Sequence, residues 1–236
     1  TRISQKILNY YKIKTQLISN HKFNEKKNIN KIILELQNSK IISLISDAGT
    51  PTISDPGKII INECIKNGVK IYSIPGPSAV TAAISVSGFS DRYFFYGFLP
   101  SNLNEIEKTF KFLSNIETSI IFFISSKKIN KIIEKLKNFF NERNIVICRE
   151  LTKFYEEIIR SPINEIKHFD NSLKGELTIV ISEKKTKIKS KNLDESDKKI
   201  IKKLFKKMSV KDIVKLVSKN KSISKKKIYE YCLSLK

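Results

Sequence analysis

The 236-residue chain contains no tryptophan, one methionine, two histidines and three cysteines. Cys64, Cys148 and Cys232 are odd in number and far apart, and no Cys or His spacing matches a ligand pattern. The sequence therefore predicts neither a disulfide framework nor a metal site. No apolar run reaches the ~18 residues of a membrane-spanning helix, and the first residues lack the apolar core of a signal peptide. We expect a soluble protein of the cytoplasm.

Acidic residues are also scarce. The chain has 23 of them against 45 basic residues, only five of which are Arg, and its formal net charge is +22. A basic surface attracts nucleic acid by neutralising phosphates and releasing their counterions. Lys, Ile and Asn are all enriched together, however, as A+T-rich codons would make them. A basic surface without a selected partner is therefore an open alternative.

The apolar pattern of the first 92 residues alternates between strand and helix periods. Residues 3–11 are typical of the end of a helix, and residues 29–36 have helical spacing. Short apolar runs at 14–18, 40–45 and 69–74 have the length of strands. This βαβ alternation predicts a mostly parallel sheet flanked by helices, with ligands outside the carboxyl ends of the strands.

A second α/β set follows a boundary that we place near residue 92. Its adjacent strands near the end favour some antiparallel pairing. The strands are expected at 93–98, 119–125, 144–150, 154–160 and 176–182, with helices at 129–140 and 163–169. The fold class is thus α/β, with an N-terminal domain over 1–92, a second domain over 93–185 and a helical tail over 192–236.

The tail predicts three short amphipathic helices at about 195–207, 210–219 and 225–235, the last two preceded by the N-cap residues Ser209 and Ser224. A unit of this size is compatible with a helix-turn-helix that binds nucleic acid. A packing or dimerisation module fits the pattern equally well, and both interpretations stay open.

Glycine and proline, rare elsewhere, gather in the stretch ISDAGTPTISDPGKIIINECIKNGVKIYSIPGPSA, which holds four of the seven glycines and four of the six prolines. Small residues directly after a strand let the backbone approach a ligand. Asp55 with Pro56, and later Ser78, are typical helix starts. The stretch lacks the glycine fingerprints of dinucleotide and P-loop sites, so it predicts a pocket of exposed backbone groups. Two plain βα turns are the alternative.

Four segments in order, SDAGTPTISDPG, IPGPSAVTAA, DRYFFYGFLP and RELTKFYE, make the chain resemble the ribosomal RNA small subunit methyltransferase I family of the tetrapyrrole methylase superfamily. The resemblance implies two α/β domains with a small helical tail, in a homodimer. It implies S-adenosylmethionine as cofactor, and 2′-O-methylation of cytidine 1402 in the 16S ribosomal RNA of the small subunit.

The resemblance also implies site residues. The cofactor is expected against two loops made of Asp47, Ala48, Gly49, Thr50, Pro51, Pro75, Gly76, Ser78, Ala79 and Val80. Glu150 and Lys153 are expected near the reacting ribose, with a structural ion pair as the alternative. His21 is a third catalytic candidate, and Arg2, Asn24 and Arg149 are expected to contact RNA.

Some family features are replaced or missing. A first βα unit of roughly 40 residues is not in this sequence, Phe23 stands where the family has a second histidine, and Ile124 stands where it has a glutamate. Two rival functions therefore stay open. One is another methyltransferase of the superfamily, acting on a tetrapyrrole or a diphthamide precursor, and the other is a non-catalytic RNA-binding remnant.

Overall fold

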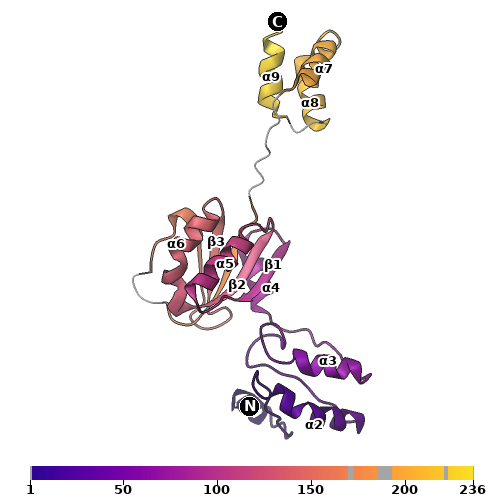
Figure 1. Ribbon diagram of the computed structural model, residues 1–236, viewed down its shortest axis with the longest axis vertical. Helices are drawn as coiled ribbons and strands as arrows, with labels where there is room; N and C mark the ends of the chain where they lie inside the picture. Colours follow the sequence, from indigo (N-terminus) through magenta and orange to yellow (C-terminus); the bar gives the residue numbers. More distant parts are fainter. Residues whose placement is uncertain (1, 170–172, 185–192, 221–222, 236) are drawn as a thin grey trace. The chain divides into compact units, whose positions relative to one another are not determined.

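The structure, a computed structural model, describes residues 2–169, 173–184, 193–220 and 223–235 (Figure 1). The chain divides into two compact units, Thr1–Lys184 and Lys185–Lys236. The boundary expected near residue 92 falls inside the first unit, so a division at that point stays a prediction.

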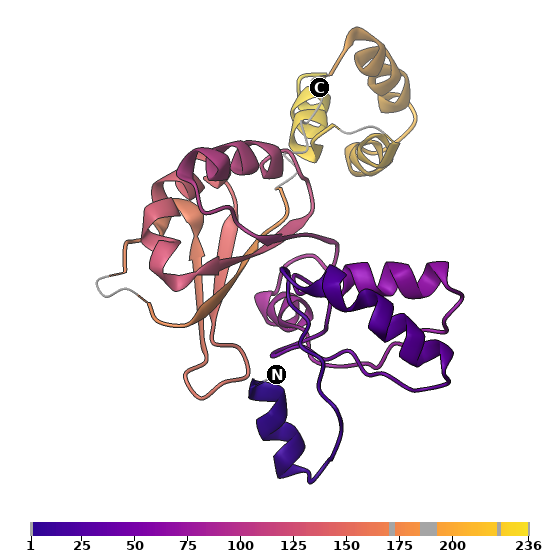
Figure 2. The ribbon, with the colours of Figure 1, turned by 60° about the horizontal axis from the view of Figure 1, so that its bottom comes forward.

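The N-terminal region of the first unit contains three helices: α1 (Arg2–Tyr10), α2 (Glu25–Gln37) and α3 (Lys58–Lys66). Helices α2 and α3 lie side by side (Figure 2). They bury Ile32 and Ile33 against Ile60 and Cys64. The helical spacing at 29–36 is confirmed, because it lies inside α2.

The three strands expected at 14–18, 40–45 and 69–74 are not formed in the described part of the chain, and that prediction was wrong. Most of their apolar side chains face solvent: Ile41 is 97% exposed and Ile74 81% exposed. Ile18 and Val69 are exceptions, because they pack partly on the core between α2 and α3. A strand is stable only when neighbouring strands complete its hydrogen bonds and cover a face. No such neighbour lies beside these segments among the described residues, so they run as irregular chain.

Helix α3 begins two residues later than Asp55 and Pro56 predict. Its N-cap is Gly57, whose φ of 132° is incompatible with a helix and favours glycine. A Cβ at this position would come within 2.7 Å of the Leu44 side chain. The SDPG segment is therefore a turn that leads into the helix rather than its first turn.

A five-stranded sheet forms the centre of the first unit, in the order β1-β2-β5-β3-β4. Its strands are β1 (Tyr93–Phe98), β2 (Ser119–Ser125), β3 (Asn144–Arg149), β4 (Glu157–Pro162) and β5 (Glu176–Ile181). β1 and β2 are parallel, whereas β5 is antiparallel to both β2 and β3, and β3 is antiparallel to β4. The expected antiparallel pairing is confirmed.

Helices cover both faces of this sheet. Side chains alternate between the faces of a strand, so Ile120 and Phe122 of β2 face one side and Ile121 the other. α5 (Leu103–Leu113) and α6 (Ile129–Phe140) pack on the first side, where the larger cluster lies. α4 (Ala79–Ser87) packs on the second side through Val80 and Ala83. Figures 1 and 2 show α5 and α6 together against the sheet.

Three local expectations differ from the structure. The helix expected at 163–169 is only a short 3-10 turn, Ile163–Glu165. β4 begins three residues later than expected, because residues 150–156 form a turn between β3 and β4. Helix α5 was not predicted at all, although Asn102 caps it by accepting a hydrogen bond from the Asn104 N–H.

The second unit contains α7 (Glu195–Phe205), α8 (Val210–Asn220) and α9 (Lys225–Leu233). Its core is made of Ile201, Ile213, Val217, Ile223, Ile228 and Cys232. Asp194 and Asp197 form a capping box at the start of α7, and Ser224 accepts the Lys227 N–H at the start of α9. The three expected helices are confirmed.

Candidate functional site

The two Gly/Pro loops touch. The Thr50 hydroxyl donates a 3.0 Å hydrogen bond to the Pro77 carbonyl oxygen. Gly49, with a φ of 71°, lies against the same carbonyl, and a Cβ there would be 3.7 Å from it. The fold thus brings together two segments, 46–51 and 75–78, that are 27 residues apart at this contact.

Within the first loop, the Ser46 hydroxyl lies 3.1 Å from the Ala48 carbonyl oxygen and 2.9 Å from that of Gly49. These contacts hold the loop in a tight turn. Asp47, Ala48 and Gly49 are exposed on it, whereas Thr50 is half-buried.

The remaining residues of the expected cofactor set differ in exposure. Pro51 and Ser78 are half-buried, and Pro75, Gly76 and Ala79 are exposed. Val80 is buried, because it packs into the sheet with α4. A ligand at these loops would therefore contact backbone groups and small side chains. Val80 would not contact it, because its side chain packs α4 on the sheet.

Carboxylates gather beside the first loop. Burial raises the pKa of Asp55, and the nearby carboxylates of Asp47 and Glu176 raise it further. Glu176 is the first residue of the central strand β5, so this interaction links the loop to the start of that strand. Gly97 of β1 lies there too, since a Cβ on it would be 3.3 Å from the Ser54 hydroxyl. The loop thus lies against strand ends of the second α/β set.

The turn after β3 holds an ion-paired cluster. The Lys153 ammonium lies 3.1 Å from Glu150 Oε1 and 2.8 Å from Glu176 Oε2. Glu150 Oε1 also accepts the Glu176 backbone N–H at 2.8 Å. The pKa of Glu150 is lowered, first by the hydrogen bond from the Glu176 N–H and then by Lys153. The pKa of Lys153 is raised, first by its hydrogen bond to Glu176 and then by the one to Glu150. Both groups are charged at neutral pH.

This cluster depends on unusual backbone. Glu150 and Thr152 have φ values of 48° and 63°, a region that non-glycine residues rarely adopt. Gly175 has a φ of 98°, and a Cβ on it would come within 2.5 Å of Glu150 Oε1. The Glu150 carboxylate accepts hydrogen bonds from the Glu176 backbone N–H and from Lys153, and these stabilise the turn. The structural ion pair is therefore present, and the catalytic role of either residue stays a prediction.

Arg149, expected to contact RNA, is also tied to the sheet. Its Nε donates to the Lys174 carbonyl oxygen at 2.8 Å, and its guanidinium pairs with Glu157 at 3.0 Å. These contacts join the end of β3 to β4 and to the segment before β5.

His21 and Asn24 lie elsewhere, in the segment before α2. Asn24 Oδ1 accepts the His21 backbone N–H at 2.7 Å, and the Asn24 amide donates to the Ser19 carbonyl oxygen at 3.1 Å. The hydrogen bonds and ring contacts of His21 in the described part of the chain are all with its own segment. The structure does not bring it to Glu150 or Lys153. Arg2 begins α1, and its side chain lies outside the described residues.

Glu25 has a structural role that the local sequence did not reveal. Its buried carboxylate accepts the backbone N–H groups of Ile59 and Ile60 at 2.9 and 3.3 Å, at the start of α3. A carboxylate satisfies the free N–H groups of a helix start and complements its dipole. Spacing rules could not find a cap supplied from 34 residues away.

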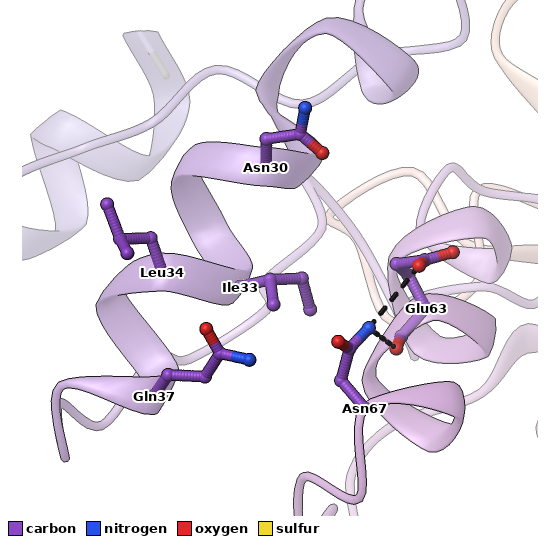
Figure 3. A pocket seen from close by; sticks show the side chains of 6 residues that line it. All are labelled: Asn30, Ile33, Leu34, Gln37, Glu63 and Asn67. Carbon is purple, nitrogen blue, oxygen red and sulfur yellow. Dashed lines mark hydrogen bonds between the residues drawn. The ribbon is translucent and has the colours of Figure 1, made fainter.

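A hollow of about 230 Å³ lies between α2 and α3, away from these loops. Figure 3 shows Asn30, Gln37 and Asn67 around it, with Asn67 hydrogen-bonded to Glu63. In the described residues, no group of three or more His, Cys, Asp or Glu could hold a metal. None of the described helices is long and apolar enough to cross a membrane.

Comparisons with known proteins give consistent matches. The family of tetrapyrrole (corrin/porphyrin) methylases matches residues 2–167. Ribosomal RNA small subunit methyltransferase I of Thermotoga maritima is 37% identical over 187 residues, covering 78% of this chain and 84% of that protein. The Mesomycoplasma conjunctivae protein of the same name is 39% identical over 202 residues, covering 85% and 84%. That of Rickettsia prowazekii is 36% identical over 234 residues, covering 97% and 83%.

Solved structures share the fold at low identity. A diphthine synthase superposes with a TM-score of 0.53 at 15% identity, covering 75% of this chain and 73% of that one. The methyltransferase CobJ gives a TM-score of 0.51 at 14% identity, covering 67% and 71%. Together with the family match, these confirm the expected fold class.

Proposed function

The chain belongs to the tetrapyrrole methylase family, within it to the ribosomal RNA small subunit methyltransferase I family, and we propose that it methylates 16S ribosomal RNA with S-adenosylmethionine. The target is the ribose 2′-hydroxyl of cytidine 1402 in the small subunit. The observation that carries the proposal is the contact between Thr50 and Pro77, which joins the two loops that hold the family's segments.

These loops fit the methyl donor. The sulfonium of S-adenosylmethionine is a cation, and Asp47, Asp55 and Glu176 place negative charge beside the first loop. The exposed backbone of Ala48, Gly49 and Gly76 allows close approach, because no large side chain covers it.

When bound, the donor would supply a methyl carbon for in-line attack by the ribose 2′-oxygen. The C–S bond would break with its electron pair left on sulfur, and the 2′-hydroxyl proton would pass to solvent water, because Lys153 is already protonated. The chain contributes mainly positioning. An ammonium has three N–H donors, and Lys153 uses two on Glu150 and Glu176. The third is available to orient a ribose or phosphate oxygen. In this proposal Lys153 is the catalytic residue, while Glu150 and Glu176 position it.

The test is transfer of a labelled methyl group by the 236-residue chain to small ribosomal subunits that lack the mark, with the product mapped by mass spectrometry of the RNA. We expect label at one cytidine ribose. Lys153→Met should lower kcat by about a hundredfold, the size expected for lost positioning of the substrate, whereas Lys167→Met, an exposed control, should not lower it. No incorporation by the parent chain would overturn the proposal.

Calorimetry with S-adenosylmethionine separates the rivals. Cofactor binding with transfer to a precorrin-type substrate would identify another superfamily enzyme. RNA binding without cofactor affinity would identify a non-catalytic remnant. We also propose a cytoplasmic homodimer, which sedimentation analysis of the purified chain would check.

A further inference from the structure

Positive charge is concentrated in the C-terminal unit. Residues 185–236 contain 18 lysines, no arginine and five acidic residues, for a formal net charge of +13 in 52 residues. Residues 1–184 contain 27 basic and 18 acidic residues, for +9. A codon bias would act along the whole chain, so it does not explain this contrast.

Part of this charge forms a face on α7. Three lysines of α7, Lys199, Lys202 and Lys203, and its C-cap Lys206 follow one another at i, i+3, i+4 and i+7. This spacing places residues on one side of a helix. All four are exposed. We call these four residues the lysine face. The opposite side of α7 carries the buried Asp197 and Ile201.

Within the described residues, none of the four ammonium groups of the lysine face makes a salt bridge. The carboxylate of Glu195 pairs with Lys198 at 2.7 Å, and Lys202 contributes only a smaller lowering of the Glu195 pKa. Like charges at i, i+3 and i, i+4 repel one another along a helix, although lysines in the last turn also interact favourably with the helix C-terminus. An external anion would relieve the repulsion.

We infer that the lysine face of α7 docks on the sugar-phosphate backbone of ribosomal RNA, so that the C-terminal unit supplies affinity for the RNA separately from the methyl-transfer site. This inference rests on the proposed function for the identity of the RNA. Lysine is a compact point charge that contacts phosphates without reading bases. A membrane is a poor occupant, because Ile201 and Leu204 of α7 pack in the core of the unit. The lysine face of a second copy carries like charge and would be repelled from this one.

The experiment measures binding of the full chain to an unmethylated transcript of the 16S segment around cytidine 1402, without cofactor, over a range of salt concentrations. The variant carries Lys199→Gln, Lys202→Gln, Lys203→Gln and Lys206→Gln. Each lost phosphate contact lowers the slope of log affinity against log salt by about 1. We therefore expect a slope smaller by about 3 to 4, and uniform weakening across unrelated RNA sequences.

A matched variant replaces four exposed lysines of the first unit that also lack salt bridges within the described residues: Lys108, Lys111, Lys131 and Lys167. Its slope should change by less than about 1. Circular dichroism should show that both variants keep the parent's helix content. An equal loss of slope in both variants, or no loss in the α7 variant, would overturn the inference.

Two readouts distinguish this inference from the proposed function. In the methyl-transfer assay, the α7 variant should raise KM for the small subunit and leave kcat and cofactor binding unchanged. If the parent chain transfers no methyl group, the salt slopes still decide whether the lysine face binds RNA. A further control measures binding to anionic phosphatidylserine vesicles. If the four substitutions lower vesicle binding and leave RNA binding intact, the lysine face binds membranes and the inference is overturned.

Discussion

Two regions of the first unit carry the same kind of apolar run and use it differently. Residues 119–125, SIIFFIS, form β2, in which Ile120, Ile121 and Phe122 are fully buried. Residues 40–45, KIISLI, form no strand, and Ile41 is almost fully exposed. β2 lies between β1 and β5, whereas 40–45 has no strand beside it in the described part of the chain.

This difference shows that an apolar run of this length is compatible with a strand. Whether the strand forms depends on neighbouring strands. Backbone N–H and C=O groups must be paired before a strand can be buried. β2 has partners on both edges. The 41–45 amides donate no backbone hydrogen bond within the described residues.

Hydrogen exchange should show the largest contrast. The paired amides of β2 exchange only through large openings, whereas those of 41–45 are free to exchange with solvent. We expect rates that differ on the order of 10³-fold or more, given the usual stability of a domain. Mass spectrometry of peptides covering 40–45 and 119–125 measures both in one sample. Comparable protection of the two peptides would mean that 40–45 is paired in solution.

Truncation of one isoleucine in the sheet and one in the 40–45 segment should give the next largest effect. Ile179→Ala in β5, where the side chain is fully buried, should destabilise the chain by about 2 to 5 kcal/mol, through lost burial and the remaining cavity. Ile41→Ala should change stability by less than about 0.5 kcal/mol, because its side chain has little burial to lose. Urea unfolding measures both. A large loss from Ile41→Ala would show that this side chain is packed.

The sequence predicted the second α/β set well, since each expected strand there corresponds to an observed one. β5 and β2 have continuous apolar runs of strand length, and partners within the same set complete them. The first set failed because its strands depend on neighbours that the pattern of each run cannot specify. α5 was missed although Ile106, Phe110 and Leu113 have helical spacing and Asn102 precedes them, a signal that could have been used.

The candidate site was predicted in part. The composition of the two loops indicated a shared pocket wall, and the Thr50–Pro77 hydrogen bond joins them. The link from Asp55 to Glu176 could not be read from spacing, because more than a hundred residues separate them. For the same reason, the local pattern around His21 did not reveal that the neighbouring Glu25 caps α3.

The Glu25 cap allows a smaller test of whether the helices α2 and α3 unfold separately from the five-stranded sheet. Glu25→Ala leaves the Ile59 and Ile60 N–H groups without their acceptor and should cost about 1 to 2 kcal/mol. Glu25→Gln keeps an acceptor oxygen and should cost less. Hydrogen exchange should rise in α3 and stay unchanged in β2. An equal rise in both would show that the regions form one cooperative unit.

The smallest expected effect concerns Glu150, in the turn between β3 and β4. Its folded-state pKa is lowered, first by the Glu176 N–H and then by Lys153. Its stabilising contribution is therefore complete above the pKa of an unfolded glutamate, about 4.3, and is lost as pH falls through the lowered folded value. Glu150→Gln should cost about 1 kcal/mol at neutral pH, and the two urea stability curves should converge in acid. Glu165→Gln, an exposed control, should follow the parent curve throughout. A deficit in Glu150→Gln that stays constant into acid would mean that shape, and not charge, holds the turn.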